Sequence, residues 1–178
     1  RPYTSKFPFE PHVPCASFRG QPEYNQEKCL GCLACEETCP AEALAHRDIV
    51  DDGAPRRVMI HYTDSCIFCG TCEAACIANH EGIKLSNKWE LSFFDRSKAL
   101  ETIEKELQLC EACGAVIACT DHLRWIAARL GELSYSSPTL YQSGLQSLGV
   151  IDPGLAAAAR DYTRADRVKI LCARCRRE

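Results

Sequence analysis

The residues with the clearest chemistry are eight cysteines arranged in two copies of one spacing. Each copy has three cysteines separated by two residues and a fourth after three more residues, and the second copy follows the first by 37 residues. The copies comprise Cys29, Cys32, Cys35 and Cys39, then Cys66, Cys69, Cys72 and Cys76. Because three thiolates at these intervals converge on three corners of one iron-sulfur cube, the doubled spacing predicts two [4Fe-4S] clusters.

The fourth cysteine of each copy is expected to serve the other cluster. It stands beyond the tight loop, and in proteins with two such cubes it reaches the second cube. The expected ligands of the first cluster are therefore Cys29, Cys32, Cys35 and Cys76, and those of the second are Cys66, Cys69, Cys72 and Cys39. With this arrangement the two sites interlock.

The alternative uses of these cysteines are disulfide bonds, zinc binding and packing as small apolar side chains. Disulfide scaffolds are typical of secreted chains shorter than about 80 residues, whereas this sequence has 178 residues and shows no cationic and apolar signal segment. Zinc binds at CxxC pairs, but it has no use for a third cysteine at the same short interval, repeated twice. The fourteen cysteines indicate a reducing compartment, and we expect the cytoplasm.

Two further CxxC pairs, Cys110 with Cys113 and Cys172 with Cys175, lie towards the end of the sequence. Four thiolates on two short knuckles form a tetrahedral set that suits Zn²⁺ or a single iron ion. The 58 intervening residues do not exclude this pairing, since closure entropy grows only slowly with length. We expect a mononuclear metal site here.

The other cysteines and the histidines have weaker patterns. Cys119 and His122 are alternative ligands for the same metal if the last CxxC pair is free. Otherwise Cys119, like Cys15, is expected to be a buried or idle thiol. The remaining histidines, expected to be surface or packing residues, are His12, His46, His61 and His80.

The fold class expected for the whole sequence is α+β, in three parts, and the first part is an extended arm over residues 1–28. Five prolines lie in this arm, and proline lacks an amide donor and restricts the residue before it. The apolar side chains of the arm are Phe7, Phe9, Val13 and Phe18. They are expected to lie against the body of the protein or a neighbouring subunit, and a disordered arm is the alternative.

Residues 29–94 are expected to form a bacterial two-[4Fe-4S] ferredoxin-like repeat, in which each cysteine loop is followed by a hairpin. In the first copy, residues 43–50 and 57–62 flank an Asp-Asp-Gly turn, which is typical of hairpins. In the second copy, residues 83–85 and 90–94 are the expected strands. A unit of this size buries little apolar surface, so we expect it not to fold without iron.

Residues 95–178 are expected to form a mostly helical extension that carries the paired CxxC knuckles. Leu100, Ile103 and Leu107 recur at helical intervals and predict a helix leading to Cys110.

Two more helices are expected farther along this extension. One begins with Asp121 as its N-cap and ends at Gly131. The other begins with Asp152 as its cap and Pro153 in the first helical position. Between them, residues 134–139 have the composition of a loop.

Charge and hydropathy argue against two classes of function. The 24 acidic and 21 basic residues give a formal charge of −3, so there is no broad basic field and nucleic acid binding is not expected. No apolar run approaches the roughly 20 residues of a membrane-spanning helix. We therefore expect any membrane association to go through partner proteins.

Several short motifs of the arm and the cysteine loops are typical of one family. They are Phe18-Arg19-Gly20, Asn25, Cys29-Leu30-Gly31-Cys32, Cys39-Pro40-Ala41, Ala43-Leu44 and Cys66-Ile67-Phe68-Cys69-Gly70. With them the sequence resembles the two-cluster ferredoxin-like subunit shared by respiratory complex I and the membrane-bound group 4 [NiFe] hydrogenases. The C-terminal CxxC knuckles make it most similar to the subunit of formate hydrogenlyase-type hydrogenases. The resemblance covers residues 1 to about 115.

The resemblance implies an electron-relay subunit without substrate chemistry of its own. Such a subunit lies on the cytoplasmic face of the membrane, between an electron-input iron-sulfur subunit and the hydrogenase small and large subunits, and meets the membrane arm only through partners. A complex I-like subunit feeding a quinone site and a polyferredoxin attached to formate or CO oxidation are the alternatives. The sequence departs from the family at Ile77, where proline is usual, and in a longer return from residue 78 to 82. Neither departure removes a cluster ligand.

Overall fold

Four antiparallel strands form the main sheet of the computed structural model, which describes residues 6–51, 53–151 and 168–177. The strand order is β2 (Leu44–Ile49), β3 (Arg56–Tyr62), β5 (Leu100–Leu109) and β6 (Val116–Cys119). The fold is a mixture of helix and strand, as the sequence predicted.

The hairpin of β2 and β3 is the one that the Asp-Gly turn predicted, and the structure confirms it. Leu44 pairs with His61 at one end of the ladder and Ile49 with Arg56 at the other. Gly53 in the turn has a φ of +80°, a conformation that glycine adopts without steric cost.

The helix expected over residues 100–107 is wrong, because this segment is β5. Along it Ile103, Lys105 and Leu107 are buried, while the residues between them are exposed, so the period is two. Every residue from 100 to 106 pairs with β3. The helix-like spacing was misleading because Leu100 is 45% exposed and belongs to no buried stripe. The main sheet therefore runs across the expected domain boundary at residue 94.

The second expected hairpin is also wrong. Strand β4 (Ile83–Leu85) pairs with β1 (Pro22–Tyr24) of the arm, and residues 90–94 form no strand. The arm approaches β4 closely enough for the Gly20 amide to donate to the Ser86 carbonyl at 2.9 Å. A Cβ at Gly20 would lie 2.3 Å from the Lys88 carbonyl oxygen, so only glycine fits at this crossing.

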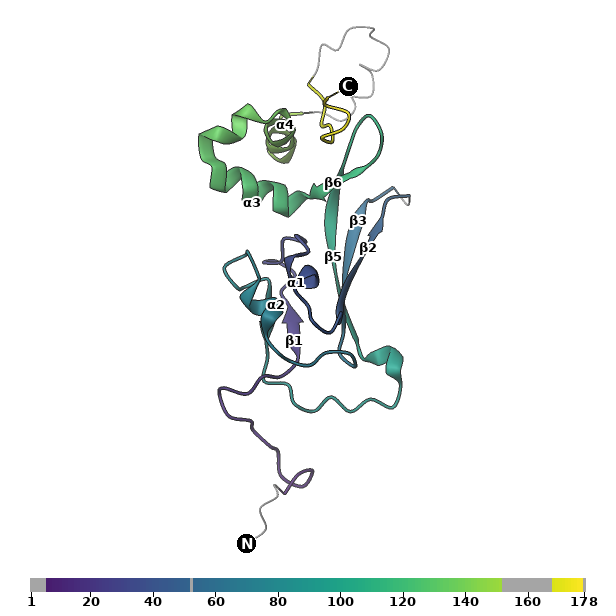
Figure 1. Ribbon diagram of the computed structural model, residues 1–178, viewed down its shortest axis with the longest axis vertical. Helices are drawn as coiled ribbons and strands as arrows, with labels where there is room; N and C mark the ends of the chain where they lie inside the picture. Colours follow the sequence, from purple (N-terminus) through teal and green to yellow (C-terminus); the bar gives the residue numbers. More distant parts are fainter. Residues whose placement is uncertain (1–5, 52, 152–167, 178) are drawn as a thin grey trace.

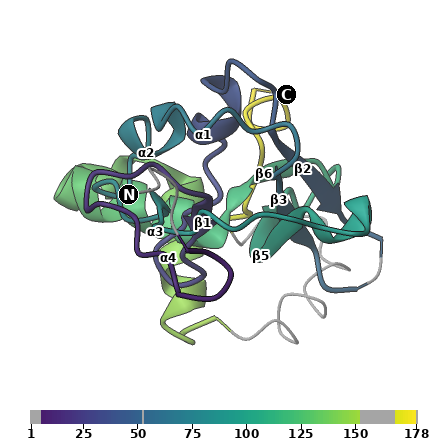
Figure 2. The same ribbon diagram turned by 90° about the horizontal axis from the view of Figure 1, so that it is seen from below.

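The two cysteine loops carry short helices, α1 (Ala34–Glu37) and α2 (Thr71–Ala74), that lie against each other. Figures 1 and 2 show both loops on one side of the main sheet. A 3-10 turn, η1 (Arg96–Lys98), then leads into β5, which runs from this region towards the C-terminal helices. The loops, the sheet face and β1 all contribute residues to two cavities.

The C-terminal extension contains α3 (Thr120–Leu130), the 3-10 turn η2 (Gly131–Ser136) and α4 (Pro138–Ser147). Helix α3 ends at Gly131 as predicted, but the N-cap position is Cys119 and not Asp121. Asp121 instead pairs with Lys105 of β5 at 2.7 Å. The loop expected over residues 134–139 is wrong in its second half, because Pro138 begins α4. The helix expected from residue 152 lies outside the described residues.

The described part of the arm touches the body through aromatic side chains. The rings of Phe7 and Trp89 lie 4.8 Å apart, and Trp89 Nε1 donates to the His12 carbonyl at 3.0 Å. Phe9 and Val13 are almost fully exposed. Among the described residues, no helix is both long and apolar enough to cross a membrane.

Candidate metal centres

The cysteine loops are shaped by residues with positive φ at equivalent positions of the repeat. In the first loop these are Gly31 (φ 64°) and Leu33 (φ 69°), and in the second Phe68 (φ 54°) and Gly70 (φ 82°). Left-handed conformations alternate here with ordinary ones, which turns the chain tightly enough to direct successive cysteines inwards. The same backbone path is thus produced twice with different residues.

The first cavity is lined by cysteines from both copies of the repeat. Cys29, Cys32 and Cys35 come from the first loop and Cys76 from the second. The rest of the lining is almost wholly apolar and consists of Tyr24, Leu30, Leu33, Met59, Ala78, Gly82 and Ile83.

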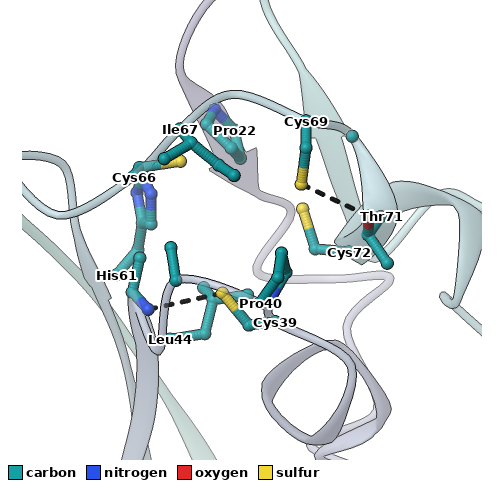
Figure 3. Close-up of a pocket in the computed structure, with 13 residues that line it drawn as sticks. Pro22, Cys39, Pro40, Leu44, His61, Cys66, Ile67, Cys69, Thr71 and Cys72 are labelled. Carbon is teal, nitrogen blue, oxygen red and sulfur yellow. Dashed lines mark hydrogen bonds between the residues drawn. The ribbon is translucent and has the colours of Figure 1, made fainter.

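The second cavity has the same organisation as the first. Cys66, Cys69 and Cys72 come from the second loop and Cys39 from the first. Figure 3 shows their four sulfur atoms around one open space, with Leu44, Ile67 and His61 on its wall. The structure therefore brings together the same two sets of four cysteines that the spacing predicted.

Backbone and hydroxyl donors point at the sulfur atoms of the second set. The amide of Phe68 donates to Cys66 Sγ at 3.4 Å, and the amide of Ala43 donates to Cys39 Sγ at 3.3 Å. Such donors stabilise sulfur atoms that carry negative charge.

Burial opposes that charge in both cavities. Burial, assisted by the neighbouring Cys29, raises the pKa of Cys35 to about 12, and burial raises the pKa of Cys72 to about 11. Four thiolates are therefore costly in either cavity unless cations compensate them, and bound iron supplies such cations. The donor sets fit iron-sulfur clusters.

Buried cations fasten the first loop to the main sheet. The Arg57 guanidinium holds both oxygens of Asp48 at 2.7 Å and donates to the Gly31 carbonyl at 2.9 Å. The hydrogen bonds from Arg57 lower the pKa of the Asp48 carboxyl. On β5, Lys105 is 6% exposed and donates to the Gln26 carbonyl at 2.8 Å. These contacts between protein groups hold the first loop against the sheet.

Cys119 packs against the same loop. It is fully buried, its Sγ lies 3.5 Å from the Gly31 carbonyl oxygen, and a Cβ at Gly31 would lie 2.4 Å from that sulfur. The structure thus places Cys119 in the core and not with the tail cysteines. His122 contacts the ring of Trp125 in α3, and Cys15 is exposed in the arm.

Two residues that line the cavities were missed by the sequence analysis. Tyr24 lies on the wall of the first cavity, and His61, expected to be a surface or packing residue, lies on the wall of the second. The signal that identifies them is positional, because Tyr24 is the fifth residue before Cys29 and His61 the fifth before Cys66.

The four tail cysteines also meet. Their sulfur atoms all lie within 4.8 Å of one another, and they belong to Cys110, Cys113, Cys172 and Cys175. Cys113 Sγ and Cys172 Sγ are 3.8 Å apart, whereas a disulfide requires about 2.05 Å. Four sulfurs at about 2.3 Å from a central zinc ion would be about 3.8 Å apart, so this spacing suits a tetrahedral ion.

The knuckles are tied together by their backbones as well. The Cys172 amide donates to Cys110 Sγ at 3.3 Å, and the Glu111 amide donates to the carbonyl of the buried Ile170 at 2.9 Å. Burial raises the pKa of Cys110, but the amides of Cys172 and neighbouring residues outweigh it and lower that pKa overall. This sulfur is prepared to bind a cation.

Comparison with known proteins bears on the cavities. Residues 28–80 match the model of the 4Fe-4S dicluster domain. The domain contains all eight cysteines of the repeat, and its cofactors are two [4Fe-4S] clusters, in agreement with the two cavities.

Three curated relatives are similar to this chain over different lengths. NAD(P)H-quinone oxidoreductase subunit I of Gloeobacter violaceus is 27% identical over 99 residues, which are 54% of this chain and 46% of that protein. Formate hydrogenlyase subunit 6 of Escherichia coli K12 is 49% identical over 41 residues, 23% of each chain. NADH-quinone oxidoreductase subunit I 2 of Geobacter metallireducens is 27% identical over 114 residues, 61% of this chain and 86% of that protein. The chain thus spans less than half of the first two relatives.

A solved structure shares part of the chain at lower similarity. It is that of the membrane-bound sulfane sulfur reductase, an archaeal respiratory membrane complex, with 18% identity and a TM-score of 0.35. The match covers 66% of this chain and 74% of the other.

The first prediction concerns Arg57. Arg57→Gln removes the bond to Gly31 and leaves the Asp48 carboxylate without its partner. We expect a loss of about 2 kcal/mol in stability, below the range for fully buried pairs because Asp48 retains contact with water. The measurement is the guanidinium concentration at which anaerobic protein loses half of its visible cluster absorbance.

The matched control for Arg57 is its neighbour on β3. Arg56 pairs with Glu104, which is 60% exposed, so Arg56→Gln should cost less than about 1 kcal/mol. Equal midpoints for the two variants would contradict the role assigned to Arg57.

Proposed function

We propose that this chain is an electron-relay subunit of a membrane-associated oxidoreductase complex, with two interlocked [4Fe-4S] clusters. The observation that carries the proposal is the grouping of eight cysteines around two cavities within a dicluster domain. When bound, each cluster takes up and passes on one electron with little change in geometry.

The ligands of the two clusters follow from the cavities. Cys29, Cys32, Cys35 and Cys76 hold the first cluster. Cys66, Cys69, Cys72 and Cys39 hold the second. Because each loop gives its fourth thiolate to the other site, the loops keep the two clusters adjacent. Cys76 of the second loop lines the first cavity although Ile77, and not proline, follows it. The departure at Ile77 therefore does not prevent Cys76 from reaching the first cluster.

The apolar side chains that line the cavities limit the access of water to the clusters. Leu30, Leu33 and Met59 exclude water from the first site, and Leu44 does so at the second. The second site lies nearer to the surface than the first, because Ile67 on its wall is 61% exposed. In this proposal the protein carries electrons and has no substrate chemistry of its own.

The partners that we propose are the small and large subunits of a [NiFe] hydrogenase and an iron-sulfur subunit that delivers electrons. The support is the 49% identity to formate hydrogenlyase subunit 6 over 41 residues. The exposed Phe9 and Val13 of the arm are available to pack against such partners. The complex would lie on the cytoplasmic face of the membrane.

A complex I-like function is the second candidate. Similarity to the quinone oxidoreductase subunits extends over 99 and 114 residues, well beyond the cysteine loops. In that case the relay would feed a quinone site. A polyferredoxin attached to formate or CO oxidation lacks such specific support.

The tail cysteines Cys110, Cys113, Cys172 and Cys175 are proposed to bind one zinc or iron ion. All four positions of a tetrahedral ion would be filled by protein sulfur, which is typical of structural sites. This site would join the end of β5 to the C-terminal segment.

The second prediction is the metal and sulfide content of the protein. Anaerobically purified full-length protein should contain about eight iron and eight acid-labile sulfide atoms for its two cubes. The measurement is chemical analysis of iron and sulfide per chain. Recovery of only four sulfides would contradict the two-cluster proposal.

The third prediction concerns the tail. Cys172→Ser together with Cys175→Ser should remove one metal ion per chain and leave the electron paramagnetic resonance of the clusters unchanged, because these sulfurs contribute to neither cavity. Elemental analysis for zinc and iron measures the loss. Cys15→Ser, in the exposed arm, is the control. Unchanged metal content in the double variant would show that these two cysteines do not bind the metal.

The fourth prediction concerns partners. A tagged chain isolated gently from its native host should bring down [NiFe] hydrogenase large and small subunits, identified by mass spectrometry and nickel content. Recovery of a quinone-binding partner would instead favour the complex I-like function. A stable monomer would contradict both.

A further inference from the structure

Tyr24 and His61 are buried polar residues whose side-chain polar atoms lack partners within the described part of the chain. Tyr24 is 9% exposed and His61 is fully buried. Tyr24 Oη and both ring nitrogens of His61 make no well-formed hydrogen bond to any described residue, although the Tyr24 hydroxyl lies beside the Cys35 thiol of the first cavity. Buried polar groups in proteins are nearly always hydrogen-bonded, so these atoms require a partner that occupies the adjoining space.

Tyr24 and His61 occupy equivalent positions of the repeat, and each borders the cavity of its own cysteine motif. Tyr24 and His61 are 37 residues apart, like the two cysteine motifs, and each precedes its own motif by five residues. Tyr24 lines the first cavity and His61 the second. Figure 3 shows His61 on the wall of the second cavity, close to Cys66. Tyr24 and His61 therefore share an equivalent position in the repeat, a place on a cavity wall and unsatisfied polar atoms.

We propose that Tyr24 and His61 donate hydrogen bonds to the sulfur atoms of the first and second clusters, respectively, and raise their reduction potentials. This proposal rests on the two-cluster function proposed above. A phenol has one O–H donor, and an imidazole has at least one N–H in either protonation state. Thiolate and sulfide sulfurs are acceptors, so donor and acceptor match at both sites.

The backbone holds both donors in place. The Tyr24 amide donates to Glu101 Oε1 at 3.3 Å, and Glu101 stands directly opposite His61 in the β3–β5 ladder. His61 also pairs with Leu44 of β2, so its strand is hydrogen-bonded on both sides. One carboxylate on the inner sheet face thus lies near both positions. Neither donor belongs to a loop that could turn away.

The effect on electron transfer follows from charge. One electron arriving from an external donor increases the negative charge on the sulfurs of the site that receives it. The O–H of Tyr24 or the N–H of His61 then interacts more strongly with those sulfurs and stabilises the reduced form. No bond breaks, and both side chains keep their protons. Hydrogen bonds to the sulfurs are among the main determinants of the potential of such a site.

The test uses the full-length protein with both clusters, titrated anaerobically and followed by electron paramagnetic resonance. Tyr24→Phe removes one oxygen, and His61→Leu removes both nitrogens at similar volume. We expect each substitution to lower the ratio of reduced to oxidised cluster at its own site roughly tenfold at fixed potential, a shift of about 59 mV for one electron. The other site should keep its potential, so the variants control each other.

Two further measurements separate a hydrogen bond from a packing effect. Leu107 is buried in the same sheet and lines neither cavity, so Leu107→Val should shift neither potential. In wild-type protein labelled with [15N]histidine, pulsed paramagnetic resonance should detect nitrogen coupling to one reduced cluster, and the coupling should disappear in His61→Leu. His61→Gln, which retains an N–H donor, should recover most of the potential.

Three results would overturn the proposal. They are unchanged potentials in Tyr24→Phe and His61→Leu, equal shifts in Leu107→Val, and no nitrogen coupling in the labelled wild type. The last result needs no substitution, so it decides even if a variant fails to assemble. Iron and sulfide analysis of the same samples keeps the outcome distinct from the proposed function, because a wild type with fewer than eight of each contradicts the clusters themselves.

Discussion

The structure depends on the exchange of one thiolate between the two cysteine loops. Cys39 lines the cavity of the second loop and Cys76 that of the first, so neither site is complete within its own copy. Helices α1 and α2 have four residues each, too few to be stable alone, and burial raises the pKa of their inner cysteines. Bound iron is therefore expected to stabilise both loops, and the loss of one cluster would also free one cysteine of the loop that mainly holds the other cluster.

The inner face of the main sheet supports the loops in three rows of paired residues. The β3–β5 ladder places Arg57 opposite Lys105, Met59 opposite Ile103 and His61 opposite Glu101. The first row holds the first loop by its carbonyls, the second packs at the apolar wall of the first cavity, and the third adjoins the second cavity. A strand has a side-chain period of two, so a single face of β3 reaches both sites.

The grouping of the eight cysteines was predictable from the sequence, but much of its structural support was not. The grouping of cysteines follows from spacing within short loops and was predicted in full. Strand β5 was missed because its inner face carries Glu101 and Lys105, charged residues that look exposed until Tyr24, Gln26 and Asp121 are brought near them. The partner of β4 was missed because β1 lies about 60 residues earlier, and no local pattern encodes that pairing.

The position of the tail cysteines bears on whether they belong to the relay. Cys110 follows directly after β5, which holds the first loop at Lys105, so the knuckle lies about five residues or roughly 17 Å farther along the strand. A tetrahedral ion surrounded by four protein sulfurs has no open position for chemistry. Its closure would fasten the C-terminal segment beside α4, where Thr139 donates to the Leu171 carbonyl at 2.9 Å and Arg176 donates to Thr139 Oγ1 at 2.8 Å. If the ion is zinc, which has no redox chemistry, the site would anchor the extension and electron transfer would remain with the two proposed clusters.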